Sequence, residues 1–158
     1  MRFLAIALVA LLAAIPASAD LVITEIMQNP SAVSDSDGEW FEVFNSGPGS
    51  VDMNGYTVQD LGADSFVIDA PLVIAEGDFA VIGVNADMGT NGGVEVDYEI
   101  PVTFYLANGD DELYIYDTGM TLVDYVEYDG GPVWPDPNGA PKYFTGGPDN
   151  NDGTLWAG

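Results

Sequence analysis

Short runs of apolar residues, many alternating with polar ones, fill the chain after residue 19, and turn-forming residues separate them. This spacing predicts strands with one buried face. No stretch after residue 19 keeps the i, i+3, i+4, i+7 apolar spacing, so we expect no helix longer than a turn. We expect eight strands, at Leu21–Met27, Trp40–Asn45, Tyr56–Asp60, Ser65–Ile68, Leu72–Ile74, Phe79–Val84, Glu112–Tyr116 and Leu122–Tyr128. Short strands between 19 glycines and 10 prolines predict an all-β, Ig-like β-sandwich.

The clearest hairpin joins residues 112–116 to residues 122–128 through Thr118 and Gly119. If Tyr116 pairs with Thr121, the hairpin has one aromatic and one aliphatic face. The aromatic face then holds Tyr114, Tyr116, Val123 and Tyr125, and the aliphatic face holds Leu113, Ile115, Leu122 and Val126. This register also places Asp124 on the aliphatic face, whereas a one-residue bulge would release it. Both arrangements remain open.

Residues 1–19 have the pattern of a cleaved secretory signal peptide: Arg2, an apolar run to Ile15, and small residues ending at Ala19. The apolar run is shorter than the ~20 residues of a spanning helix, so we expect no membrane span. The remaining residues, 20–158, contain no internal repeat and are interpreted as one domain. We therefore expect a secreted protein that ends in the medium, on the cell surface or in the periplasm.

Residues 130–158 are rich in Gly, Pro, Asn and Asp but also hold Trp134, Tyr143, Phe144 and Trp156. A disordered tail has few aromatic residues. We therefore predict a loop-like strap that packs its aromatic side chains on the sandwich.

Acidic residues dominate the charge of the chain: 26 Asp and Glu face 2 Lys and Arg, with no His and no Cys. Without Cys or His, thiol nucleophiles, Ser-His-Asp relays, thiolate or imidazole zinc sites and disulfides are excluded. A net charge of -24 repels phosphate backbones, so we expect no direct binding to nucleic acid. The same charge fits either a solvated acidic surface or specific cation sites.

Several sequence blocks, in this order, resemble the bacterial lamin-tail domain. They are Leu21–Pro30, Asp37–Asn45, Val51–Asp60, Leu72–Val81, Gly109–Tyr116, Leu122–Val126 and Asp149–Trp156. The resemblance implies an Ig-like β-sandwich in a secreted bacterial protein, of a kind that commonly forms non-catalytic modules beside extracellular nucleases and phosphatases. Its animal relatives sit behind a coiled-coil rod, which this chain lacks, so nuclear roles do not carry over. The chain then either stands alone or is the N-terminal accessory module of a longer secreted nuclease or phosphatase.

Two acidic loops are candidate calcium sites, since calcium takes six to eight oxygen ligands. The first loop contains Asp35, Asp37 and Glu39, and the second contains Asp149, Asn151 and Asp152. Neither loop matches an EF-hand. The alternative is a polar turn in which these side chains bond their own backbone.

Partner binding and catalysis are the remaining candidate roles. Tyr114, Tyr116 and Tyr125 can form a surface for a sugar or a protein, or can simply stabilise the sheet. Glu25 and Glu42 are expected to accept hydrogen bonds within the sandwich, and a glycosidase-like acid pair is the weaker alternative. Altogether the sequence predicts a non-enzymatic module for extracellular proteins or polysaccharides, with calcium as a candidate stabiliser. A carbohydrate-binding module is a further alternative. The sequence leaves the oligomeric state open.

Overall fold

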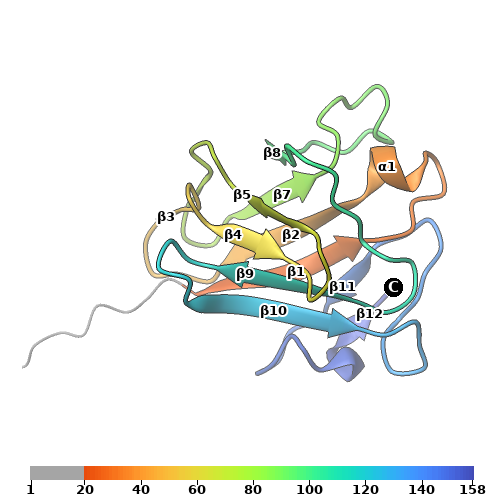
Figure 1. Cartoon of the computed structure of the whole chain (residues 1–158). Coiled ribbons are helices and arrows are strands. Elements are labelled where there is room, and N and C mark those ends of the chain that lie inside the picture. Colours follow the sequence, from red (N-terminus) through yellow and green to blue (C-terminus); the bar gives the residue numbers. More distant parts are fainter. Residues whose placement is uncertain (1–19) are drawn as a thin grey trace, which may run out of the picture.

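Two β-sheets lie face to face in the structure, a computed structural model that describes residues 20–158 (Figure 1). One sheet has six strands in the order β12-β11-β1-β2-β7-β8. These strands are β1 (Leu21–Met27), β2 (Trp40–Asn45), β7 (Phe79–Gly83), β8 (Tyr98–Glu99), β11 (Lys142–Phe144) and β12 (Trp156–Ala157). The other sheet has four strands in the order β10-β9-β4-β5. Its strands are β4 (Thr57–Gln59), β5 (Ser65–Val67), β9 (Asp111–Tyr116) and β10 (Leu122–Tyr128).

The rest of the regular structure is short. A small ribbon pairs β3 (Val51–Asp52) with β6 (Val73–Ile74). The helical segments are α1 (Asp35–Gly38) and the 3-10 turn η1 (Gly153–Leu155). The predicted all-β, Ig-like sandwich and the absence of long helices are therefore confirmed for residues 20–158. Within that range, no helix has the length and apolarity needed to cross a membrane. The signal-peptide interpretation of residues 1–19 lies outside the described residues.

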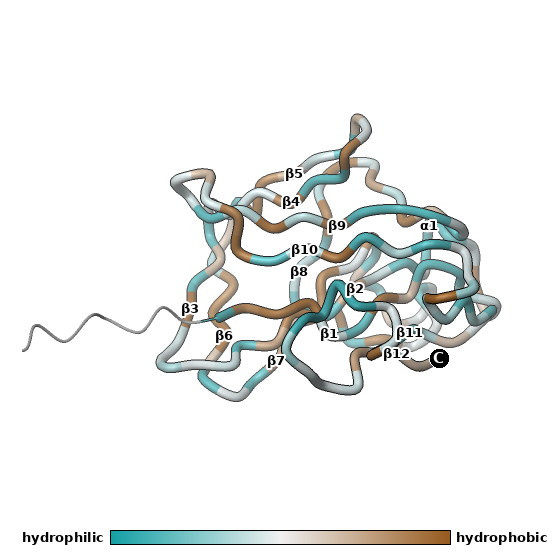
Figure 2. Tube along the Cα trace, turned by 90° about the horizontal axis from the view of Figure 1, so that it is seen from below, coloured by the Kyte–Doolittle hydropathy of each residue, from teal (hydrophilic) through white to brown (hydrophobic). Residues whose placement is uncertain are grey.

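The core forms where the inner faces of the two sheets meet. Ile23 and Val43 of the six-stranded sheet and Val58, Leu113 and Ile115 of the four-stranded sheet are all 0% exposed and belong to one hydrophobic cluster. Figure 2 shows hydrophobic positions interleaved with hydrophilic ones along the chain. Period-two alternation therefore buries one face of each sheet and leaves the other face free for contacts.

All eight predicted strands are present, with ends within about one residue of the prediction. The sequence missed β3, β8, β11 and β12, each of only two or three residues. Two of these lie in the predicted strap. The strap does pack Trp134 and Trp156 against the core, both 7% exposed, but it also adds β11 and β12 to the six-stranded sheet. The interpretation of this segment as loop-like was therefore incomplete.

The β9–β10 hairpin combines both alternatives left open by the sequence. Tyr116 pairs with Leu122, and a bulge follows between Leu122 and Asp124. The predicted pairing of Tyr116 with Thr121 was wrong, as was the inward position of Leu122, which is 44% exposed. The bulge shifts Leu122 outward but leaves Asp124 directed into the sandwich. There the Asp124 carboxylate accepts a hydrogen bond from the Ile23 amide.

This hydrogen bond is part of a junction between β1, β10 and the C-terminal segment. Oδ2 of Asp124 accepts hydrogen bonds from the Ile23 amide at 2.7 Å and from Nδ2 of Asn150 at 2.7 Å. The same Asn150 amide group donates to the Ile23 carbonyl at 3.1 Å. Two side chains thus satisfy the amide and the carbonyl of Ile23, which lies opposite Val43 of β2. Burial raises the pKa of Asp124 to about 6.

Removing the carboxylate should destabilise the protein. We expect Asp124→Ala to lower the free energy of unfolding by about 2 to 3 kcal/mol, because the buried Ile23 amide and the Asn150 side chain both lose a charged acceptor. Urea unfolding followed by tryptophan fluorescence would measure this. Asp110→Ala, at an exposed position, is the matched control and should change the value by less than about 0.5 kcal/mol. Equal effects from both variants would contradict the role of the junction.

Candidate functional site

The outer face of the four-stranded sheet carries three neighbouring tyrosines. Tyr114 and Tyr116 come from β9, and Tyr125 lies opposite Tyr114 on β10. The ring centroids of Tyr114 and Tyr125 are 5.2 Å apart and those of Tyr114 and Tyr116 are 6.3 Å apart, with interplanar angles of 17° and 12°. All three side chains are half-buried, so part of each ring faces solvent. We call this surface the tyrosine face.

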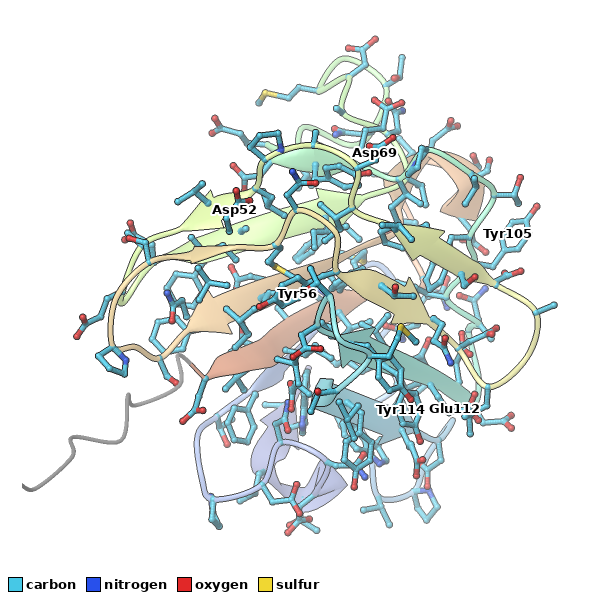
Figure 3. All side chains as sticks on the ribbon, turned by 60° about the vertical axis from the view of Figure 1, so that its left-hand side comes forward. Asp52, Tyr56, Asp69, Tyr105, Glu112 and Tyr114 are labelled. Atoms are coloured by element: carbon cyan, nitrogen blue, oxygen red, sulfur yellow. The ribbon has the colours of Figure 1, made fainter. Side chains whose placement is uncertain are left out.

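Polar side chains surround the tyrosine face. The Tyr114 hydroxyl donates a hydrogen bond to Glu127, which raises the pKa of Tyr114 to about 12. On β4, Gln59 lies opposite Tyr114 and Thr57 lies opposite Tyr116. Figure 3 labels Tyr114 and Glu112, which project from β9 close together. The face therefore combines aromatic surface with hydroxyl, amide and carboxylate groups.

The first acidic loop does not converge on one point. Its three carboxylates contact three different partners. Asp37 accepts a hydrogen bond from the Ser34 hydroxyl, and Asp35 accepts one from the Asn108 side chain. Glu39 lies beyond the loop, is only 3% exposed, and accepts a hydrogen bond from the Leu106 amide at 3.1 Å. Its burial raises its pKa to about 8.

The second acidic loop uses its oxygens to hold turns. Asp149 accepts a hydrogen bond from the Asn151 amide, and Asp152 caps η1 by accepting bonds from the Thr154 amide and hydroxyl. Asn151 accepts a bond from the Glu127 amide and so ties the loop to β10. Across residues 20–158, no three acidic side chains gather in a way that could hold a metal ion. Calcium binding therefore stays a prediction, and the structure brings the six candidate residues together at neither loop.

A second surface, on the outer face of the six-stranded sheet, was not foreseen. A groove of about 660 Å³ lies there. Its lining includes Thr24, Glu25, Glu42, Phe44, Phe79 and Tyr143. The sequence had indicated Glu25 and Glu42 only as separate strand residues. Their convergence depends on how β1 pairs with β2, which hydrophobic patterning does not specify at single-residue precision.

Lys142, the single basic residue between positions 20 and 158, does not reach either surface. It is 0% exposed, and its ammonium lies 3.7 Å from the centroid of the Tyr128 ring. Burial lowers the pKa of Lys142 to about 8, and Nζ has no hydrogen-bond partner among the described residues. Its burial gives the amine no access to an external substrate.

The fold defines an Ig-like β-sandwich module. The sequence model of the Lamin Tail Domain family matches residues 14–130, about three quarters of the chain, and the chain belongs to that family. The match includes β1 to β10 and ends before β11, so the C-terminal strap lies outside it. No curated protein matches the chain. The predicted resemblance to the lamin-tail domain is thereby confirmed.

The buried Glu39 carboxyl should make stability depend on pH. Its folded-state pKa of about 8 exceeds the ordinary glutamate value of 4.5, so its stabilising protonation is complete at low pH and is lost as pH rises towards 8. We expect the free energy of unfolding to fall by up to about 4 kcal/mol from this group between pH 4.5 and pH 8. Urea unfolding at several pH values would show the slope.

Two substitutions isolate this contribution. Glu39→Gln keeps an acceptor for the Leu106 amide and cannot ionise, so its unfolding free energy should depend less on pH. Glu95→Gln removes an exposed carboxylate and should leave the slope nearly unchanged. A wild-type slope retained in Glu39→Gln would show that other groups cause it.

Proposed function

We propose that the chain is a secreted, non-catalytic association module that binds an uncharged glycan through its tyrosine face. The observation that carries this proposal is the stacking of Tyr114 against Tyr116 and Tyr125 on an outer sheet face. Tyrosine offers a large apolar ring and a polar hydroxyl at low entropic cost. A sugar ring has the matching chemistry, with apolar C–H groups on its faces and hydroxyls around its rim.

The polar groups around the tyrosines favour a glycan as the ligand of the tyrosine face, rather than a flat apolar molecule. Gln59, Thr57 and Glu127 provide donors and acceptors at the edges of the rings. Carboxylates and amides form strong hydrogen bonds with sugar hydroxyls when water is displaced. The net charge of -24 disfavours anionic polysaccharides, so the proposal is limited to uncharged ones.

A non-catalytic role fits the chemistry of the chain. It contains no His and no Cys, and Lys142 is buried away from both surfaces. Membership of the Lamin Tail Domain family supports the same conclusion. Secretion is part of the proposal, and the leader-like sequence of residues 1–19 supports it.

Affinity electrophoresis of residues 20–158 in gels containing uncharged polysaccharides would test the tyrosine face. We expect a polysaccharide that retards the wild type to bind Tyr114→Ala/Tyr116→Ala at least about tenfold more weakly, because truncating two central aromatic anchors together costs more than the ~1.4 kcal/mol that corresponds to tenfold. Loss of cross-strand pairs costs only ~0.2 to 1 kcal/mol per pair, so the variant should still fold. A thermal melt would verify this.

Tyr105→Ala is the matched control, because Tyr105 is 56% exposed and lies outside β9 and β10. It should be retarded like the wild type. The glycan proposal fails if no uncharged polysaccharide retards the wild type, or if the folded double variant is retarded equally. Tyr125→Ala, a milder single change, should give an intermediate result.

A further inference from the structure

The groove on the six-stranded sheet contains two carboxylates placed directly opposite each other. Glu25 of β1 and Glu42 of β2 are cross-strand partners in the register, and both line the groove. Like charges in this position are destabilising. Burial and the neighbouring charge of Glu42 raise the pKa of Glu25. The sheet thus tolerates an electrostatic repulsion between Glu25 and Glu42 that two apolar residues at the same positions would not have.

Local geometry aims this pair into the groove. A bulge in β1 between Ile23 and Glu25 interrupts the pairing register. The Thr24 hydroxyl donates to Oε1 of Glu42 at 2.7 Å, which fixes one carboxylate. No corresponding hydrogen bond is found for the Glu25 carboxylate within residues 20–158. One carboxylate is therefore oriented, and the other is available to a ligand.

Aromatic side chains form the rest of the binding surface. Phe44 and Phe79 are cross-strand partners whose ring centroids lie 4.6 Å apart. Phe79 is 53% exposed and Tyr143, also in the groove, is 46% exposed. Exposed apolar area of this kind marks an interaction site when it gathers on one surface. Aromatic faces next to carboxylates are the surroundings that a cationic side chain prefers.

We propose that this groove binds an extended segment of a basic partner protein, with a lysine or arginine side chain between Glu25 and Glu42 and the apolar side chains two residues away against Phe44 and Phe79. We choose a basic partner because its positive charge complements the two carboxylates of the groove. A second copy of the folded domain offers only Lys142 as a base, and that residue is buried. A hard metal ion needs more oxygen ligands than the two carboxylates and one hydroxyl supply. This surface is separate from the tyrosine face.

Titration calorimetry with a short peptide would test the groove. The probe is a five-residue peptide with a central lysine, a serine on each side of it, a valine at each end and blocked termini, so that the lysine and both valines share one face when it is extended. Its partner is the same peptide with glutamine in place of lysine. At about 0.15 M salt, charges on distant surfaces are largely screened. We expect the lysine peptide to bind and the glutamine peptide to bind at least about tenfold more weakly.

Matched double variants distinguish the groove from the general acidity of the protein. Glu25→Gln/Glu42→Gln should weaken binding of the lysine peptide at least about tenfold. The melting temperature of this protein variant should not fall, since the repulsive pair is gone. Glu95→Gln/Asp110→Asn removes the same charge from exposed positions and should weaken binding less than about twofold. Phe79→Ser, which keeps both carboxylates, should also weaken it.

Three results would overturn the proposal. Equal loss in the two double variants would assign the binding to non-specific attraction. Equal affinity for both peptides would remove the cation from recognition. A dimer in sedimentation that dissociates on Phe79→Ser would show that a second copy covers the groove. Because the glycan assay uses Tyr114 and Tyr116, its outcome is independent of these results.

Discussion

The alignment of the two sheets depends on a single carboxylate, that of Asp124, which accepts a hydrogen bond from the backbone of the opposite sheet. β1 lies inside the six-stranded sheet with Ile23 opposite Val43 of β2, yet the Ile23 amide and carbonyl bond to the side chains of Asp124 and Asn150. Asp124 belongs to the opposite sheet and Asn150 to the C-terminal segment, so one small network fixes the relative position of three parts of the chain. The network therefore also fixes the positions of the tyrosine face and of the groove, because both lie on the strands that it joins. β10 presents Tyr125 on its outer side, and β1 presents Glu25 in the groove.

The same use of carboxylates recurs across the molecule because the chain has almost no bases. Acidic side chains that would form ion pairs elsewhere accept hydrogen bonds from the backbone. Asp52 accepts bonds from the Asn54 and Leu72 amides, and Asp117 accepts bonds from the Gly119 and Thr121 amides. Such bonds to charged acceptors are stronger than neutral ones. An acidic chain can thus order its turns without paired lysines, and its excess charge then remains for the surface and for partners.

Hydrophobic alternation was enough to predict the sandwich, its eight main strands and the shared face of the three tyrosines. It failed for strands of two or three residues and for the orientation of single side chains. The two residues of β12 carry no periodicity, and Leu122 has the composition of a core residue although the bulge turns it outward. Glu39 illustrates a second limit. Its acidic neighbours Asp35 and Asp37 made it resemble a surface ligand, whereas its own carboxylate accepts a hydrogen bond from the Leu106 amide in the interior. Single-residue register and tertiary hydrogen bonds are set by the whole fold.

The pairing of β1 with β11 joins the beginning of the folded domain to a strand near its end, with Ile26 opposite Lys142. Contacts so distant along the chain close slowly, because a long loop must be ordered before they form. The six-stranded sheet therefore cannot be completed while the ribosome still holds the last strands. For a chain that is synthesised from its N-terminus, the edge of β1 that β11 covers therefore stays unpaired until translation is nearly finished.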